Sequence, residues 1–262
     1  MPSDMELQEK RKAALAEAGL PTEVVDDHIE QEDLQVPRVK LAQGSSKEVK
    51  DGTAKVGEFV NSVTGKSYGE EIIFLISQYI RQRIKFGEEG SAVFDCLSLD
   101  SKTGNVHGRC SECNYSSFVD EEGNKKPKGP ECSLIHGFLG MVLSEKMDIL
   151  DPCIMLSMSS TSTGTAKKIL TTHKLSRPMR NLWERVWRIG SAKKEKGQYS
   201  WLQFTAQPSK FLDPENDKHI EVMKLGHELY QWSEGKKIAI EEGDEERAKS
   251  VPIEDENVEA PF

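Results

Sequence analysis

Short alternating runs of hydrophobic and polar residues cover most of the chain, which is typical of β-strands separated by turns. Residues 36–69 show this pattern, broken by Gly, Ser, Asn and Asp. The strongest strand signal is EIIFLISQYIRQRIKF at 71–86, which is long enough to bend sharply or to carry a β-bulge. GFLGMVLSE at 137–145 and CIMLSMS at 153–159 predict two further strands.

A lysine-rich stretch between two strand-like segments predicts a β-hairpin. The segments are NLWERVWRIG at 181–190 and QYSWLQFTA at 198–206, and SAKKEKG connects them, although the first segment also fits a helix. Many short strands with few helices favour a small Greek-key barrel over a parallel α/β sheet, so we expect a mainly β fold. Helices are predicted over 4–18, 165–175 and 213–235, the last with Pro214 in its first turn.

Charge is distributed unevenly along the 262 residues, whose net charge is −9. Residues 1–33 carry a net −7 and residues 241–262 also carry −7, which leaves +5 for residues 34–240. A basic body between acidic ends is compatible with nucleic-acid binding, although charged ends also keep a protein soluble. We therefore expect an acidic helical extension at 1–33, a basic body at 34–235 that is the candidate nucleic-acid-binding part, and an acidic disordered tail at 236–262. The sequence has no membrane span and no secretory h-region, so we expect a cytoplasmic protein without a membrane partner.

Four cysteines close together in the sequence predict a metal site. Cys110 and Cys113 form a C-x₂-C motif, whose spacing lets two thiolates meet one metal ion from a tight turn. Cys96 and Cys132 flank this loop, at 96–132, and would complete the closed tetrahedral geometry of a structural Zn²⁺ site. Zinc would also order a loop that is rich in Gly, Ser, Lys and Asn and has no core of its own.

Several alternatives to this zinc site stay open. His107 or His136 is an alternative fourth ligand, and four reduced thiols without metal are the alternative to zinc. Cys153 lies in an apolar run and is expected in the core. A closed site is structural, the histidines are scattered, and the sequence has no P-loop, no G-x-S-x-G motif and no compact carboxylate cluster in the body. We therefore expect no enzymatic activity.

Aromatic and cationic side chains share faces on the predicted strands, because alternate residues of a strand point the same way. Such a surface suits single-stranded nucleic acid: cations follow the phosphates, and flat rings stack on bases for about 1–3 kcal/mol per base. A place in the core is the alternative for each tryptophan, and most of all for Trp183 and Trp187. The candidate DNA-binding residues are Tyr79, Arg81, Arg83, Lys85, Trp183, Arg185, Trp187, Lys193, Lys194, Lys196, Tyr199 and Trp201.

Four segments together resemble a family of phage-encoded single-stranded DNA-binding proteins, over roughly residues 36–230. These segments are VPRVKLAQGSSKEV, GEFVNSVTGKSYG, the cysteine loop and GQYSWLQF. The C-x₂-C motif inside a barrel is also similar to the zinc-bearing helix-destabilising proteins of T-even phages. The resemblance implies an OB-like (oligonucleotide/oligosaccharide-binding) Greek-key barrel with an inserted zinc loop, in the cytoplasm of the host cell. It leaves open a homo-oligomer, cooperative binding along the strand, and the choice between DNA and RNA.

The final EDENVEAPF is similar to the acidic tip of bacterial single-stranded DNA-binding proteins. This resemblance implies that the ring of Phe262, after Pro261, enters a hydrophobic pocket on replication and repair proteins. Asp255, Glu256 and Glu259 would approach a basic rim of that pocket. The alternative is a tail that only keeps the protein soluble.

Together these features predict a single-stranded DNA-binding protein of a phage replication and recombination system. It would coat exposed strands without strong sequence preference and recruit partners through its acidic tip. The main alternative is a recombination protein that anneals complementary strands, which an annealing assay would separate. A zinc-dependent nuclease and a zinc-ribbon transcription factor are the further alternatives.

Overall fold

A computed structural model of the chain describes residues 4–18, 36–44, 46–87, 94–120, 122–126, 129–178, 180–196, 199–236 and 238. Helix α1 (Asp4–Glu17) belongs to one unit, and its bounds confirm the predicted N-terminal helix. All other described helices and strands belong to a second unit, which begins at Val36. The predicted acidic tail, 236–262, lies outside the described residues except for Lys236 and Ile238, and Ile238 packs against the body.

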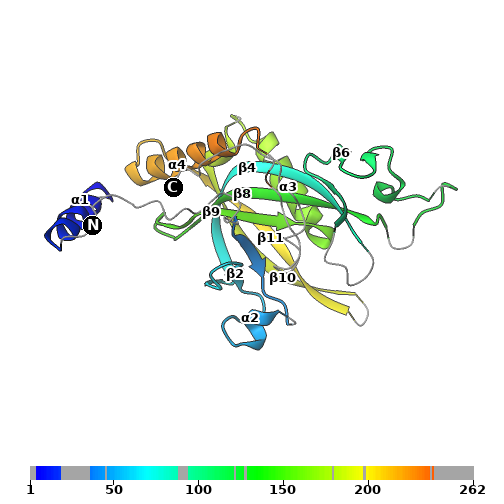
Figure 1. Ribbon diagram of the computed structural model, residues 1–262, viewed down its shortest axis with the longest axis horizontal. Coiled ribbons are helices and arrows are strands. Elements are labelled where there is room, and N and C mark those ends of the chain that lie inside the picture. Colours follow the sequence, from blue (N-terminus) through cyan, green and yellow to red (C-terminus); the bar gives the residue numbers. More distant parts are fainter. Residues whose placement is uncertain are drawn as a thin grey trace. The chain divides into compact units, whose positions relative to one another are not determined.

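The second unit is mainly β, as predicted, and its main sheet is curled into a half-barrel (Figure 1). The strands of this sheet are β1 (Arg38–Leu41), β2 (Phe59–Asn61), β3 (Ser67–Gly69), β4 (Glu71–Phe86), β5 (Phe94–Ser98), β8 (Cys132–Leu143), β9 (Ile149–Met158), β10 (Arg185–Lys196) and β11 (Tyr199–Phe211). Their order is β11-β10-β4-β8-β9-β1-β2-β3, and β5 pairs with the end of β4. All neighbours are antiparallel except β1 and β9, which run parallel.

Helices and a small ribbon complete this unit. The α-helices are α2 (Lys47–Lys50), α3 (Thr163–Leu175) and α4 (Asp217–Ser233). The described 3₁₀-helices are short, and they are η2 (Asn114–Ser116), η3 (Ser160–Ser162) and η4 (Leu182–Glu184). Strands β6 (Thr103–Gly104) and β7 (Gly108–Arg109) pair with each other in the loop that follows β5. Among the described strands, β11 and β3 stand at the two ends of this strand order and do not pair with each other.

Strand β4 is the central element, and its shape agrees with the prediction of a bulge. The register against β8 shifts between Ile76 and Gln78, where one extra residue bends the strand. The bend brings the two backbones close together at Gly140 of β8. A Cβ at this position would lie 1.9 Å from the Leu75 carbonyl oxygen, so no residue with a side chain fits there without a backbone shift.

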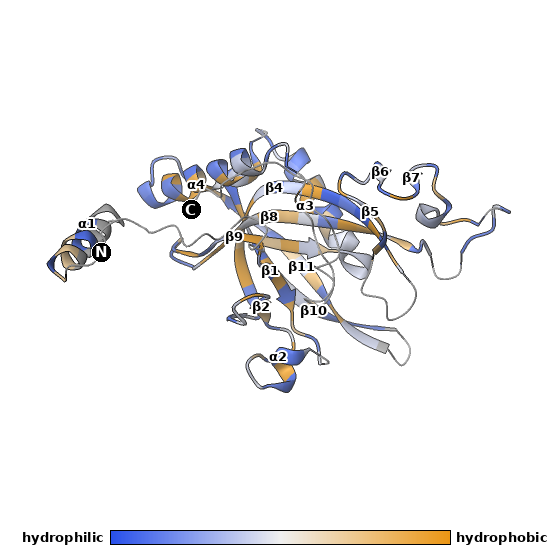
Figure 2. Ribbon diagram, viewed as in Figure 1, coloured by the Kyte–Doolittle hydropathy of each residue, from blue (hydrophilic) through white to orange (hydrophobic). Residues whose placement is uncertain are grey.

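Both faces of the sheet are apolar, because each is covered by a helix. Alternate residues of β4 divide between the two sides, so Phe74 packs with Ile169 of α3 and Leu75 packs with Leu229 of α4. Figure 2 shows hydrophobic colours along much of β8 and β9 and hydrophilic colours along much of α4. The core therefore consists of two apolar layers, one on each side of the sheet.

Most element predictions are confirmed, with two differences. The expected β-hairpin is present, but its strands extend from Arg185 to Phe211, so the lysine-rich stretch is largely strand and not turn. Helix α4 begins later than predicted, because the Asn216 side chain accepts the backbone N–H groups of Lys218 and His219 and caps the helix there. Pro214 therefore precedes the helix, and its placement in the first turn is wrong.

Candidate nucleic-acid interface

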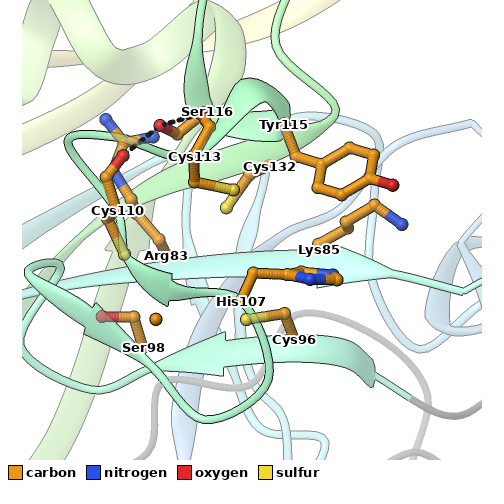
Figure 3. Close-up of a pocket in the computed structure, with 11 residues that line it drawn as sticks. Arg83, Lys85, Cys96, Ser98, His107, Cys110, Cys113, Tyr115, Ser116 and Cys132 are labelled. Carbon is orange, nitrogen blue, oxygen red and sulfur yellow. Dashed lines mark hydrogen bonds between the residues drawn. The ribbon is translucent and has the colours of Figure 1, made fainter.

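The four predicted cysteine ligands converge at the end of β4. Cys96 of β5 and Cys132 of β8 both pair with Lys85, so they flank β4 at the same level. Cys110 and Cys113 approach from the loop that contains β6 and β7. All four side chains line one cavity of about 10 Å³, the space of a single water-sized sphere (Figure 3).

Local hydrogen bonds hold the C-x₂-C turn beside this cavity. The Cys110 N–H donates to the Lys102 carbonyl at 2.8 Å, which ties the turn to the β6–β7 ribbon. The Ser116 hydroxyl donates to the Cys113 carbonyl at 2.9 Å and also to the Cys110 carbonyl (Figure 3). Gly104 leaves room for Cys96, since a Cβ there would lie 2.6 Å from the Cys96 sulfur.

Charges around the cavity suit a cluster of thiolates. Arg83, Lys85 and His107 line it together with the cysteines. Burial raises the pKa of the Cys132 thiol, whereas the charge of Arg83 and its hydrogen bond to the sulfur act in the opposite direction. Four thiolates around one Zn²⁺ carry a net charge of −2, which Arg83 and Lys85 would offset.

The arrangement of the described side chains leaves the zinc site a prediction. No group of three or more His, Cys, Asp or Glu residues in the described ranges is arranged to hold a metal ion as it stands. Coordination would therefore require the four sulfur atoms to draw together to about 2.3 Å from an ion. His107 stays close to the cavity. His136 does not line it, since its Nδ1 atom lies 2.7 Å from the Tyr79 hydroxyl on the face covered by α3.

Next to the cysteine cavity lies an open cleft of about 460 Å³ that is rich in positive charge. Arg81 is exposed on β4, and Lys102 and Arg109 are exposed on the opposing ribbon. None of the described residues that line this cleft is acidic. The full lining, which we call the basic cleft, is Arg81, Arg83, Ser101, Lys102, Thr103, Arg109, Cys110 and Ser111.

The ribbon side of the basic cleft is held by Asp100. Its Oδ1 atom accepts the backbone N–H groups of Lys102 at 2.7 Å and Thr103 at 2.9 Å. These bonds to the ionised form lower the pKa of Asp100, so its charge is satisfied by the backbone. Arg109 pairs with Glu112 at 3.3 Å, but both side chains are well exposed and such a pair is weak.

Sequence reasoning found Arg81 and Arg83 of the basic cleft but missed Lys102 and Arg109. Both missed residues lie within the cysteine loop, which was assigned only to metal binding. Their positive charge so close to the C-x₂-C motif was the available signal. The cleft itself depends on the fold of this loop back toward β4, which the spacing of the residues does not reveal.

Two other candidates on β4 have local partners. Tyr79 is half-buried, packs against Phe138 with 5.5 Å between ring centroids, and has its pKa raised by burial. Lys85 forms an ion pair with Asp95, and its Nζ atom lies 4.3 Å from the centroid of the Tyr115 ring. Lys85 therefore faces the cysteine cavity, and Tyr79 belongs largely to the packing beneath α3.

Three candidates near the start of β10 serve packing instead of forming an exposed surface. Trp187 is 1% exposed and lies in the core, which corrects its assignment to DNA binding. Trp183 on η4 packs against Tyr230 of α4 at 4.9 Å between centroids. The guanidinium of Arg185 lies 3.8 Å from the centroid of the Phe211 ring. Trp187 lies under α3, Trp183 lies under α4, and Arg185 is held against Phe211 of β11, so these side chains are not free to meet a ligand.

The β10–β11 hairpin carries the remaining candidates. Lys193 and Lys194 are exposed, and Lys193 pairs with Glu195 at 2.7 Å. Trp201 is opposite Lys194 and half-buried. The side chains of Lys196 and Tyr199 lie outside the described residues, as do Asp255, Glu256, Glu259, Pro261 and Phe262.

The hairpin and the basic cleft are separate places on the sheet. Strand β10 pairs antiparallel with the first residues of β4, from Glu71 to Leu75, so its far end extends past the start of β4. The cysteine loop instead follows β5 at the end of β4. The residues predicted to form a single surface are therefore divided between the basic cleft, the cysteine cavity, the hairpin and the packing under α3 and α4.

The fold and the site define a mainly β protein with a basic cleft next to a cysteine cluster. The chain belongs to the Pam3 phage gp34-like protein family, whose family model matches residues 12–237, and it is thus a member of a phage protein family. Neither the curated proteins nor the solved structures include a match to this chain. No helix in the described part of the chain is both long enough and apolar enough to cross a membrane.

Proposed function

We propose that this phage-family protein binds single-stranded DNA without strong sequence preference. The observation that carries the proposal is the basic cleft, where exposed cations from two separate elements face one open space that no acidic side chain lines among the described residues. Arg81 comes from β4, whereas Lys102 and Arg109 come from the ribbon. A phosphate backbone that passes between these elements would meet positive charge on both sides.

The rest of the lining supports the same chemistry. Ser101, Thr103 and Ser111 add hydroxyl groups, which donate readily to phosphate oxygens. Direct reading of a base edge needs side chains that are held against it in a fixed geometry, and the exposed cations of the cleft are suited to phosphates instead. The curled half-barrel also supports assignment to the OB-like class, whose members bind single strands across a curved sheet.

The proposal includes a structural zinc ion at the cysteine cavity. Cys96, Cys110, Cys113 and Cys132 would be its ligands, and Arg83 and Lys85 would offset the negative charge of the thiolates. The ion would fix the C-x₂-C turn against β5 and β8, because this loop has little apolar core of its own. We assign no chemical step to it.

Recruitment of replication and recombination proteins through the acidic tip is the remaining part of the proposal. It rests on the sequence alone, namely on the acidic residues that precede Pro261 and Phe262. Removal of the chain from Glu254 onward should abolish capture of such partners while single-strand binding is kept or strengthened. Loss of single-strand binding in this variant would contradict the role given to the tip.

Fluorescence anisotropy with a labelled single-stranded oligonucleotide and a duplex of equal length tests the DNA-binding proposal. We expect tighter binding to the single strand, and affinity that falls with salt. Each phosphate contact contributes about 0.7 to the slope of log K against log salt, so Arg81→Ala with Lys102→Ala should reduce that slope by about 1.4.

A matched control replaces two exposed lysines of α2, Lys47 and Lys50, with Ala. These side chains lie on an element that does not line the basic cleft, so the control should keep the wild-type slope. Equal losses in the control and the cleft variant would contradict the proposal. Equal affinity for duplex and single strand would contradict it as well.

A further inference from the structure

We infer that metal loading of the cysteine cluster sets the affinity of the basic cleft for single-stranded DNA, an inference that rests on the proposed function. The cysteine cavity and the basic cleft have lining residues in common. Arg83 and Cys110 line both the cysteine cavity and the basic cleft. A change in the position of either residue therefore reaches both sites at once.

The ribbon that carries the cleft cations is attached directly to the cluster. Arg109 precedes Cys110 in the sequence, and the Cys110 N–H donates to the carbonyl of Lys102 at 2.8 Å. Thr103 pairs with Arg109 across the ribbon. Lys102 and Arg109 are thus within one residue or one hydrogen bond of a proposed metal ligand.

Two hydrogen bonds to β5 also fix this ribbon: the Asn105 N–H donates to the Leu97 carbonyl at 2.9 Å, and the Leu97 N–H donates to Asn105 Oδ1 at 2.8 Å. The ribbon itself is short. Its two strands are only two residues long each, and residues 105–109 are all exposed. Between Lys102 and Cys110, only Gly104 and Cys110 are buried, and both lie against the cysteine cavity or its ligands. The ribbon is therefore fixed by Asn105 near its turn and by the cluster at Cys110, next to Arg109.

Metal loading would join the ribbon to the sheet. One ion held by Cys110 and Cys113 on the loop side and by Cys96 and Cys132 on the strand side links the ribbon to β5 and β8. Lys102 and Arg109 would then face Arg81 before DNA arrives. Preorganisation of this kind raises affinity, because the ordering entropy of the loop is no longer lost on binding.

The charge of the zinc cluster partly opposes this gain in DNA affinity. A tetrathiolate zinc centre carries a net charge of −2 and attracts Arg83, which already donates to the Cys132 sulfur. The charge of Arg83 is then shared between the cluster and the phosphates. Two cations, Lys102 and Arg109, become fixed while Arg83 is partly neutralised, so the net effect of loading is tighter binding.

The experiment uses the full chain under reducing conditions, first stripped with a chelator and then titrated with Zn²⁺ alone. Affinity for a single-stranded oligonucleotide should rise about tenfold and the salt slope should steepen by about 1.4, the equivalent of two phosphate contacts. Both changes should be complete at one zinc ion per chain. Circular dichroism before and after stripping verifies that the main sheet stays folded.

Two cysteine variants separate the cluster from the rest of the protein. Cys113→Ser should bind DNA like the stripped protein and should not respond to zinc. Cys153→Ser is the matched control, because Cys153 is packed against the α4-side core and lies outside the cavity lining. It should respond to zinc as the wild type does.

Several results would overturn the inference. They are an unchanged affinity and salt slope on zinc loading, a protein that takes up no zinc, and a Cys113→Ser variant that binds as tightly as the loaded wild type. Hydrogen exchange of residues 102–110, measured without DNA, tests the coupling independently, and zinc should slow it. If zinc slows this exchange but neither form binds single strands, then the proposed function fails while the link between cluster and ribbon holds.

Discussion

Replacement of Gly226 by alanine tests how closely α4 packs onto the sheet. A Cβ at this position would lie 2.6 Å from Leu75 Cδ2 and 2.9 Å from Trp183 Cβ. Leu75 is fully buried, so its side chain has little free space to move into. The Cβ of Trp183 is fixed to its own backbone and cannot rotate away. The added methyl group must therefore push α4 off the sheet or displace η4.

The expected magnitude follows from two opposing effects. Alanine is favoured over glycine inside a helix by about 1 kcal/mol. Overpacking of a well-packed layer costs about 1–3 kcal/mol, and a contact with a fixed Cβ belongs at the upper end of this range. The net change is a loss of about 1–2 kcal/mol in the free energy of unfolding. For a body of this size, that loss lowers the Tm by roughly 2–8 °C.

Thermal unfolding followed by circular dichroism measures this change. Gly164→Ala in α3 is the matched control, since a Cβ there would meet nothing within 4 Å. The control should unfold at the wild-type temperature or above it, because only the helix propensity changes. A Gly226→Ala variant as stable as the wild type would refute the close approach of α4 to β4 and η4.

Three further predictions concern the core, the buried histidine and the cysteine cluster. Trp187→Ala should lower the free energy of unfolding by about 3–5 kcal/mol. Trp201→Ala should weaken single-strand binding by about 1–3 kcal/mol and keep the Tm if that ring stacks on a base. A Trp201→Ala variant that loses stability but not affinity, with the opposite result for Trp187→Ala, would exchange their roles. Burial lowers the pKa of His136 to about 4 from its ordinary 6.5. The unfolded chain therefore binds a proton first, and stability should fall as pH drops from 6.5 toward 4; a His136→Gln variant with the same pH dependence would contradict this. Metal analysis should find one zinc ion per chain, and Gly104→Ala, whose Cβ would displace the Cys96 sulfur, should retain less; equal zinc content in both proteins would argue against this geometry.

Local sequence patterns were sufficient for the elements that depend on neighbouring residues. The apolar run of β4 predicted both the strand and its bulge, and the four cysteines grouped by their spacing line one cavity. These features depend on the intrinsic preferences of short segments and on ligand geometry.

The exposure of a face could not be predicted in the same way. Alternation shows which residues share a side of a strand, but it does not show whether a distant helix covers that side. Trp187 is in the core because α3 packs on its side of the sheet, and Trp183 is covered by α4. Lys102 and Arg109 were missed for the converse reason, because the fold brings their loop back to Arg81.

The parallel pairing of β1 with β9 has a consequence for the order in which this protein assembles. Arg38 lies beside Met155, so the first strand of the sheet obtains that neighbour only after more than half of the chain has left the ribosome. Until then, β1, β2 and β3 can pair with one another but have no central strand to join. The apolar strand β4 likewise lacks its partner until β8 has been synthesised. Contacts between such distant residues slow folding and leave apolar, unpaired strands exposed during synthesis. Truncated products that stop before β9 should therefore aggregate, and recombinant expression should improve when translation is slowed by cooling.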